Sequence, residues 1–215
     1  GTSQTSNDYG SLDRFRINTS NLDEHTFTVS QDSEAPSGFS NSLKYLVGTA
    51  ETALASDEKA SIEHRIEAQN LQHLAYGTSD AKALTLSFWV RSSLTGTYYI
   101  SLRHHDAGSS YTSAYTINTA NTWEKKTITV SGNTSTVINN DSGIGLWVRW
   151  SLGTGATLQT STFDTWGSNY QYAGSDQEEV ITSTGATFYI TGVQLEVGSV
   201  ATDFEHRSYG EELAL

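Results

Sequence analysis

The chain has 215 residues, with 24 acidic and 12 basic side chains, no cysteine and a formal net charge of −12. This acidity disfavours binding to nucleic acid or to anionic membranes, because both carry negative charge. The lack of cysteine excludes disulfides, thiol catalysis and cysteine-ligated zinc. No apolar stretch approaches the length of a membrane-spanning helix, so we expect no membrane insertion. Because of the negative net charge, we also expect no nucleic-acid partner.

One domain over residues 1–215 is the simplest organisation, because no internal repeat or low-complexity linker divides the chain. Alternating polar and apolar residues predict short strands at 12–17, 25–31, 42–48, 61–68, 83–92, 95–104, 113–119, 122–130, 144–152 and 186–199. The alternation breaks at 69–76, where a short helical turn ending at Gly77 is predicted. Short strands without a long amphipathic helix predict an all-β fold, a two-sheet antiparallel β-sandwich of the jelly-roll type.

Three of the predicted strands carry large side chains on both faces. In 83–92, Phe88 and Val90 form a core stripe, while Trp89 and Arg91 point the other way. Residues 95–104 are expected to pair with this strand as a hairpin. The stripes Ile100 with Leu102 and Leu146 with Val148 turn four more side chains outward: Tyr99, Arg103, Trp147 and Arg149.

Such an outward face suits a sugar, because pyranose rings stack on aromatic rings and guanidinium groups hydrogen-bond hydroxyls. Glu63, Arg65 and Glu67 would add polar partners if their strand lies alongside. The alternatives are that loops or a second subunit cover these aromatics, that arginines simply stack on the tryptophans, or that a bulge reverses the facing.

The long segment 163–174, FDTWGSNYQYAG, is a second candidate binding site. It carries Trp166, Tyr170 and Tyr172, and long loops at the end of a sandwich often bind ligands. The alternative for Trp166 is a packing anchor.

Evidence for catalysis or a transition metal is weak. Carboxylates are plentiful, but none of the hydrolase or phosphate-loop motifs occurs, so we expect no enzymatic activity. His104 and His105 point to opposite faces of a strand, and His104 with Asp106 lacks a visible third ligand. His64 lies on the apolar side of its strand, which predicts a core histidine.

Residues 66–92, 122–130 and 188–215 resemble a domain of virion and tail-fibre-like proteins of bacteriophages, especially marine ones. That domain in turn resembles jelly-roll carbohydrate-binding modules. The resemblance implies a non-catalytic module that binds glycans on a cell surface, in a virion or extracellular setting, with a homo-oligomer within a fibre as a further expectation. The alternative is a purely structural or oligomerisation domain of a tail fibre.

Jelly-roll modules of this kind often hold a structural calcium ion. The resemblance therefore allows such an ion here, although no cofactor is required. The usual paired aspartates are replaced by Thr191 and Gly192, which leaves Glu196 as a weak candidate ligand.

Overall fold

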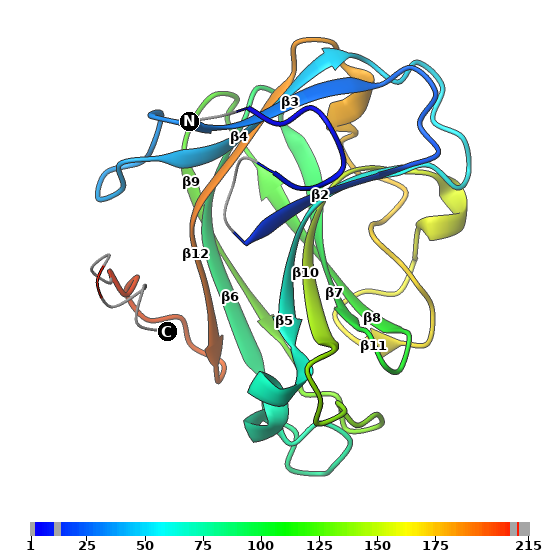
Figure 1. Ribbon diagram of the computed structural model, residues 1–215, viewed down its shortest axis with the longest axis vertical. Coiled ribbons are helices and arrows are strands. Elements are labelled where there is room, and N and C mark those ends of the chain that lie inside the picture. The colour runs from blue at the N-terminus through cyan, green and yellow to red at the C-terminus, as the bar shows by residue number, and fades with distance from the viewer. Residues whose placement is uncertain (1–2, 11–13, 207–209, 211–215) are drawn as a thin grey trace.

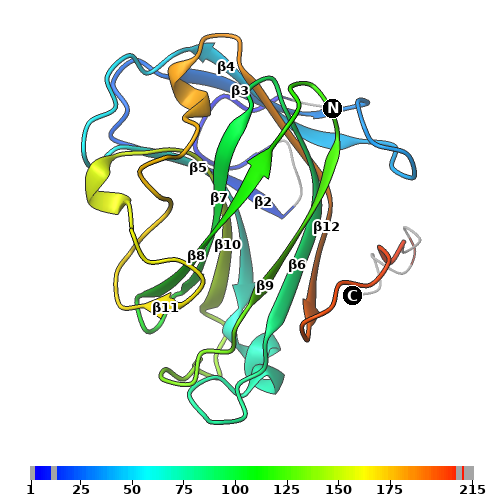
Figure 2. The same cartoon turned by 180° about the vertical axis from the view of Figure 1, so that it is seen from behind.

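The computed structural model describes residues 3–10, 14–206 and 210, and it shows two antiparallel β-sheets packed face to face (Figure 1 and Figure 2). The seven-stranded sheet contains, in spatial order, β1 (Asp8–Tyr9), β2 (Phe15–Ser20), β5 (Lys59–Glu67), β10 (Ile144–Thr154), β7 (Gly96–His104), β8 (Ser109–Ile117) and β11 (Trp166–Gly167). The five-stranded sheet contains β3 (Thr26–Asp32), β4 (Ser42–Thr49), β12 (Thr187–Val197), β6 (Leu84–Ser92) and β9 (Glu124–Val130). The short 3₁₀ helices are η1 (Ala68–Leu74), η2 (Ala156–Leu158) and η3 (Val180–Thr182).

Most connections cross from one sheet to the other. The chain changes sheets after β2, β4, β5, β6, β8, β9 and β11, while β3–β4 and β7–β8 are hairpins within a sheet. Repeated crossing of this kind is the mark of a jelly-roll sandwich. The predicted fold class is therefore confirmed, and so is the helical turn, which η1 forms and which Ala75 ends with a positive φ of 54°.

Alternate residues of the long strands fill the space between the sheets. The residues predicted to form the core are all buried: Phe88, Val90, Ile100, Leu102, Leu146 and Val148. Phe88 of β6 and Trp150 of β10 meet edge to face across the two layers, with ring centroids 5.6 Å apart. The predicted facing of these strands is correct, so the intervening side chains lie on the outer faces of the sandwich.

The predicted hairpin between residues 83–92 and 95–104 is wrong. Strand β6 pairs with β12 and β9 in the five-stranded sheet, whereas β7 pairs with β10 and β8 in the other sheet. Both edges of each strand are thus already occupied, and the short link between them crosses the sandwich. The Tyr98 hydroxyl secures this crossing, because it lies within hydrogen-bonding distance of both Ser92 Oγ and the Leu94 carbonyl oxygen, at 2.9 Å each.

The segment between β10 and β12, which includes β11, runs beside β7 and β8 (Figure 1). It reaches the outer face of the seven-stranded sheet through backbone hydrogen bonds such as Glu178 N–H to the Thr97 carbonyl, 2.7 Å. In the described part of the chain, no helix is long and apolar enough to cross a membrane.

Candidate functional site

The outer face of the seven-stranded sheet collects most of the residues predicted to bind a ligand. The strand register places Trp147 of β10 between Arg65 of β5 and Arg103 of β7. Two residues further along β10, Arg149 lies between Glu63 and Ser101 in the same way. Because every second residue of a strand shares a face, these side chains project to one side of the sheet.

Arginine and aromatic side chains alternate across this face in a continuous row. The row consists of Arg65, Trp147, Arg103, Tyr170, Arg149 and Tyr172, and we call it the arginine–aromatic row. The Cζ atom of Arg65 lies 4.4 Å from the Trp147 ring centroid, and that of Arg103 lies 5.4 Å from it. Arg103 is also 3.9 Å from Tyr170, and Arg149 is 4.0 Å from Tyr172. Each contact is within cation–π range.

Arg149 forms the buried base of the row. Its side chain is fully buried, and its Nη2 donates to Ser101 Oγ at 2.6 Å and to the Gln171 carbonyl at 2.9 Å. Its Nε and Nη1 have no hydrogen-bond partner among the described residues. Arg149 therefore ties the 163–174 segment to the sheet, which is why the two sites predicted separately form one.

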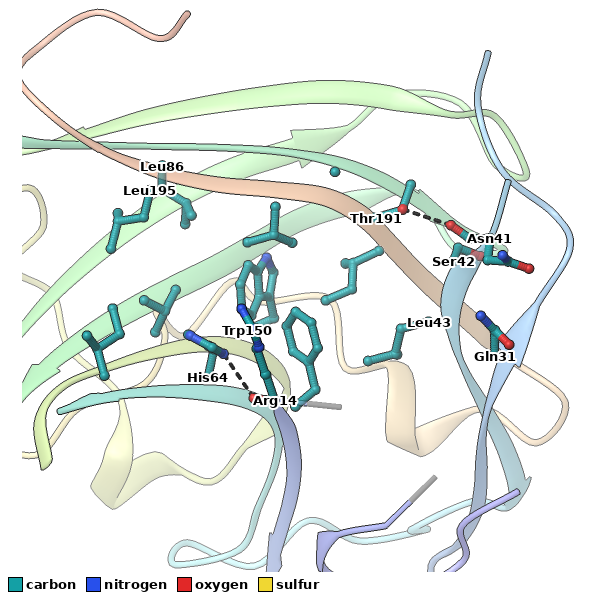
Figure 3. Close-up of a pocket in the computed structure, with 16 residues that line it drawn as sticks. Arg14, Gln31, Asn41, Ser42, Leu43, His64, Leu86, Trp150, Thr191 and Leu195 are labelled. Carbon is teal, nitrogen blue, oxygen red and sulfur yellow. Dashed lines mark hydrogen bonds between the residues drawn. The ribbon is translucent and has the colours of Figure 1, made fainter. Parts of the chain in front are cut away.

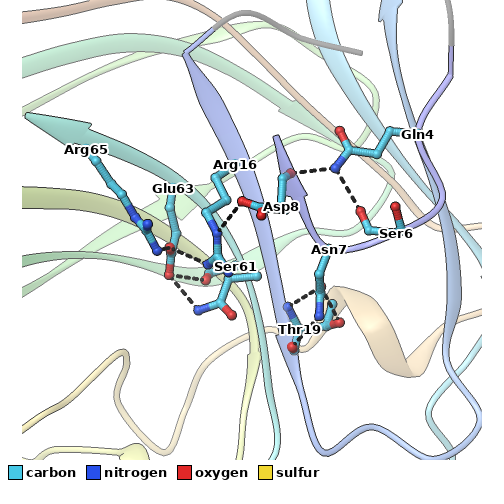
Figure 4. Close-up of polar contacts among 10 residues, drawn as sticks. Gln4, Ser6, Asn7, Asp8, Arg16, Thr19, Ser61, Glu63 and Arg65 are labelled. Atoms are coloured by element: carbon cyan, nitrogen blue, oxygen red, sulfur yellow. Dashed lines mark hydrogen bonds and ion pairs between the residues drawn. The ribbon is translucent and has the colours of Figure 1, made fainter. Parts of the chain in front are cut away.

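Glu63 is the buried carboxylate of this face (Figure 4). Its Oε1 accepts hydrogen bonds from Asn18 Nδ2 at 2.8 Å and from Ser61 Oγ at 3.2 Å. Its Oε2 lies 3.2 Å from Arg16 Nη1 and 3.7 Å from Arg65 Nη2. Both oxygens are engaged, so Glu63 orients Arg16 and Arg65 on this face.

Two of the predicted contact residues, Tyr99 of β7 and Tyr172 of the 163–174 segment, are buried between that segment and the sheet. Tyr99 is buried, and its hydroxyl donates to Asp176 Oδ1 at 2.5 Å. Tyr172 is buried too, and its hydroxyl is hydrogen-bonded to that of Tyr170. Burial raises the pKa of both Tyr99 and Tyr172. These rings support the segment, as the loop-covered alternative predicts, and they offer no open surface to a ligand.

The part of the face that solvent reaches is formed by four half-buried side chains: Arg65, Arg103, Trp147 and Tyr170. Exposed His105 adds to them, because its ring stacks on Trp147 at 5.4 Å between centroids. From the sequence, His105 was considered only as a metal ligand, and this contact was missed. The available signal was its position directly after the strand that carries Arg103.

Trp89 and Arg91 do not belong to this site. They lie on the outer face of the five-stranded sheet, across the whole sandwich from Trp147. Arg91 stacks on Tyr189 at 5.0 Å and pairs with Glu34 at 3.7 Å. The wrong hairpin explains the error, because a β6–β7 pair would have put Trp89 and Tyr99 on one face.

Trp166 packs as an anchor on neighbouring rings. Its ring meets Tyr76 at 5.8 Å and Tyr111 at 5.7 Å, and its Nε1 donates to the Ser131 carbonyl at 2.7 Å. This is the alternative that the sequence had left open for this residue.

A cavity of about 430 Å³ lies between the two sheets (Figure 3). Its walls are core side chains of both sheets, including Trp150, Val148, Leu86 and Ile190. His64 faces this cavity, as its place on the apolar side of the strand predicts, but it is half-buried and not part of the closed core; its Nδ1 lies 2.9 Å from the Arg14 carbonyl oxygen. The lining is mainly apolar, with polar side chains contributed by Gln31, Asn41, Ser42, His64 and Thr191.

The described residues contain no group of three His, Asp or Glu side chains placed to hold a metal ion. His104 is buried with its Nδ1 2.9 Å from Thr136 Oγ1, and Asp106 accepts from the Asn139 backbone N–H. Both oxygens of Glu196 accept hydrogen bonds from Thr202, which lower the pKa of that carboxyl group. Calcium binding at Glu196 stays a prediction.

No protein-family model matches the chain, and no curated protein sequence does. The family 11 carbohydrate-binding module of the cellulase Lic26A-Cel5E of Clostridium thermocellum is similar over 94% of this chain and 98% of its own, with 10% identity and a TM-score of 0.45. A CBM22 xylan-binding domain from Paenibacillus barcinonensis covers 87% of this chain and 94% of its own, with 17% identity and a TM-score of 0.43. The enzymatically active domain of bacteriophage CBA120 tailspike protein 4 matches 86% of this chain at 14% identity and a TM-score of 0.47, and this chain spans 19% of it. Likenesses at these identities and scores do not identify a function for this chain.

Proposed function

We propose that this chain is a non-catalytic glycan-binding module, and that the outer face of the seven-stranded sheet is its binding surface. The observation that carries the proposal is the arginine–aromatic row, whose solvent-accessible members Arg65, Trp147, Arg103 and Tyr170 lie side by side. Aromatic surface contacts the C–H patches of a sugar ring, while guanidinium N–H groups donate to its hydroxyls.

The sheet holds this surface in a fixed shape. Trp147 is on the central strand β10, and its flanking arginines are on the neighbouring strands β5 and β7. A binding surface that is already ordered loses little conformational entropy when a ligand binds. Because guanidinium groups flank the indole ring, a sugar would contact the accessible part of Trp147 and the adjoining face of Tyr170.

The proposal includes a viral setting. We propose that the module is exposed outside the cell in a virion or tail-fibre-like protein, where it would meet bacterial surface glycans. This part rests on the resemblance of residues 66–92, 122–130 and 188–215 to phage virion domains. A homo-oligomer within a fibre is part of the same proposal.

The second candidate function is a purely structural module. One observation favours it: Tyr99, Tyr172 and Trp166 pack against other protein side chains. In addition, Arg65 and Arg103 both stack on the ring of Trp147. In this case the row stabilises the 163–174 segment and binds nothing.

A glycan array with the intact chain, followed by multi-angle light scattering, separates the two functions. Selective binding to a set of related glycans supports the proposed function. Binding to no glycan together with a tight oligomer would favour the structural module.

A further inference from the structure

Arginines are concentrated on the outer face of the seven-stranded sheet. The protein has twice as many acidic as basic side chains, yet four of its seven arginines lie on this face: Arg16, Arg65, Arg103 and Arg149. We propose that the glycan bound here is anionic, carrying carboxylate or sulfate groups, and that Arg103 contacts the anionic group. The inference rests on the proposed function, because it names the class of glycan for the same face.

The four arginines differ in whether their charge is compensated. Arg16 and Arg65 share the carboxylate of Glu63, at 3.2 and 3.7 Å. Arg103 and Arg149 have no carboxylate within ion-pair distance in the described part of the chain. In a chain so rich in Asp and Glu, two adjacent arginines without an acidic partner are candidates to pair with an anionic group of a ligand.

Nitrogen atoms without hydrogen-bond partners lie on the same two arginines. The Nε of Arg103 and the Nε and Nη1 of Arg149 have no partner among the described residues. Burial lowers the pKa of Arg103, and the positive charge of Arg149 nearby adds to this effect. Burying an unpaired cation is costly, so a bound anion would gain energy here that it would not gain at an exposed arginine.

The shape of the site assigns the contact to Arg103. Its guanidinium is half-buried and lies between the rings of Trp147, 5.4 Å away, and Tyr170, 3.9 Å away. A planar guanidinium can form two parallel hydrogen bonds with a carboxylate or a sulfate. Those two rings would contact the sugar that carries the anion. Arg149, buried beneath, adds positive potential through a medium of low dielectric constant.

The test compares matched charged and neutral polymers with the wild-type protein by isothermal titration calorimetry in 0.15 M salt. Polygalacturonate is paired with its carboxyl-reduced form, and dextran sulfate with dextran, so that the two pairs separate carboxylate from sulfate. Poly-L-glutamate serves as an anionic polymer without sugar rings. We expect at least one charged glycan to bind about 10-fold tighter than its neutral partner and tighter than polyglutamate, a difference of about 1.4 kcal/mol.

Two variants locate the effect. Arg103→Gln should reduce the charged-to-neutral affinity ratio to within about 3-fold, whereas Arg91→Gln, which removes a stacked arginine from the opposite face, should leave it unchanged. The wild-type ratio stands as a test even if Arg103→Gln folds poorly.

Each remaining outcome overturns the inference in a different way. Equal affinity for charged and neutral glycans, or binding to neutral ones alone, would overturn it and leave the proposed function intact. Equal binding of polyglutamate would show a general polyanion surface. If Arg91→Gln lost the preference for charged over neutral glycans, the contact would lie on the five-stranded sheet instead. Absence of binding to any glycan would refute the proposed function as well.

Discussion

Replacing Phe88 with alanine should destabilise the protein strongly, whereas the same change at its neighbour Trp89 should have a much smaller effect. Phe88 is fully buried and lies edge to face against Tyr115 at 5.3 Å and Trp150 at 5.6 Å. Burial of a phenylalanine contributes about 1.5–3 kcal/mol. Each aromatic pair adds about 0.5–1.5 kcal/mol. The expected loss for Phe88→Ala is therefore about 3–5 kcal/mol, as for other large core truncations.

Trp89 lies half-buried on the outer face of the same strand, so Trp89→Ala should cost less than about 2 kcal/mol. Urea denaturation of both variants, followed by circular dichroism, measures the two free energies of unfolding. In a protein of this size, Phe88→Ala should also lower the melting temperature by about 10 °C. Equal losses for the two variants, or a cost below about 1 kcal/mol for Phe88→Ala, would refute the alternate facing of β6 on which the site depends.

Trp166→Ala should lower the free energy of unfolding by about 3 kcal/mol and leave glycan affinity per folded molecule unchanged, because the ring packs on Tyr76 and Tyr111; a folded variant with lost binding would contradict this. Burial opposes the ionisation of Glu124, but the Lys126 ammonium and the N–H groups of Asn118 and Thr119 outweigh it and lower the pKa of Glu124 from 4.5 to about 2. The lowered pKa stabilises the folded state above about pH 4.5, and this contribution is lost as the pH falls towards 2. Glu124→Gln should therefore reduce the fall in the free energy of unfolding between these pH values, and an unchanged pH dependence would contradict this prediction. If calcium binds at Glu196, EDTA should lower the melting temperature and added calcium should restore it; an unchanged melting temperature in EDTA would refute calcium binding there.

The facing of individual strands could be predicted from the sequence, because alternation is a local property. Phe88 faces the core and its neighbour Trp89 faces the outside of the sandwich. In the same way, Val148 faces the core, while Trp147 and Arg149 lie on the outer face. Strand partners could not be predicted, since they depend on contacts between distant segments. The partner of β6 that displaces the expected hairpin is β12, about a hundred residues later in the chain.

The same limit explains how much of the site was found. Trp147, Arg103 and Arg149 were predicted as site residues because alternation along each strand put them on the side away from the core. The sequence offered no sign that Tyr170 and Tyr172 would join them, because the segment that carries them has no periodicity. Its position is set by tertiary hydrogen bonds, such as that from Arg149 to the Gln171 carbonyl.

The central claim is that glycans bind on the outer face of the seven-stranded sheet. The most direct test is calorimetric titration of the tightest-binding glycan into the wild-type protein, Trp147→Ala and Trp89→Ala, with each melting temperature measured alongside. We predict that folded Trp147→Ala binds about 5- to 150-fold more weakly, a loss of about 1–3 kcal/mol as for aromatic stacking on other ring-shaped ligands, and that Trp89→Ala binds like wild type. Undiminished binding by folded Trp147→Ala, or weakened binding by Trp89→Ala, would contradict the claim.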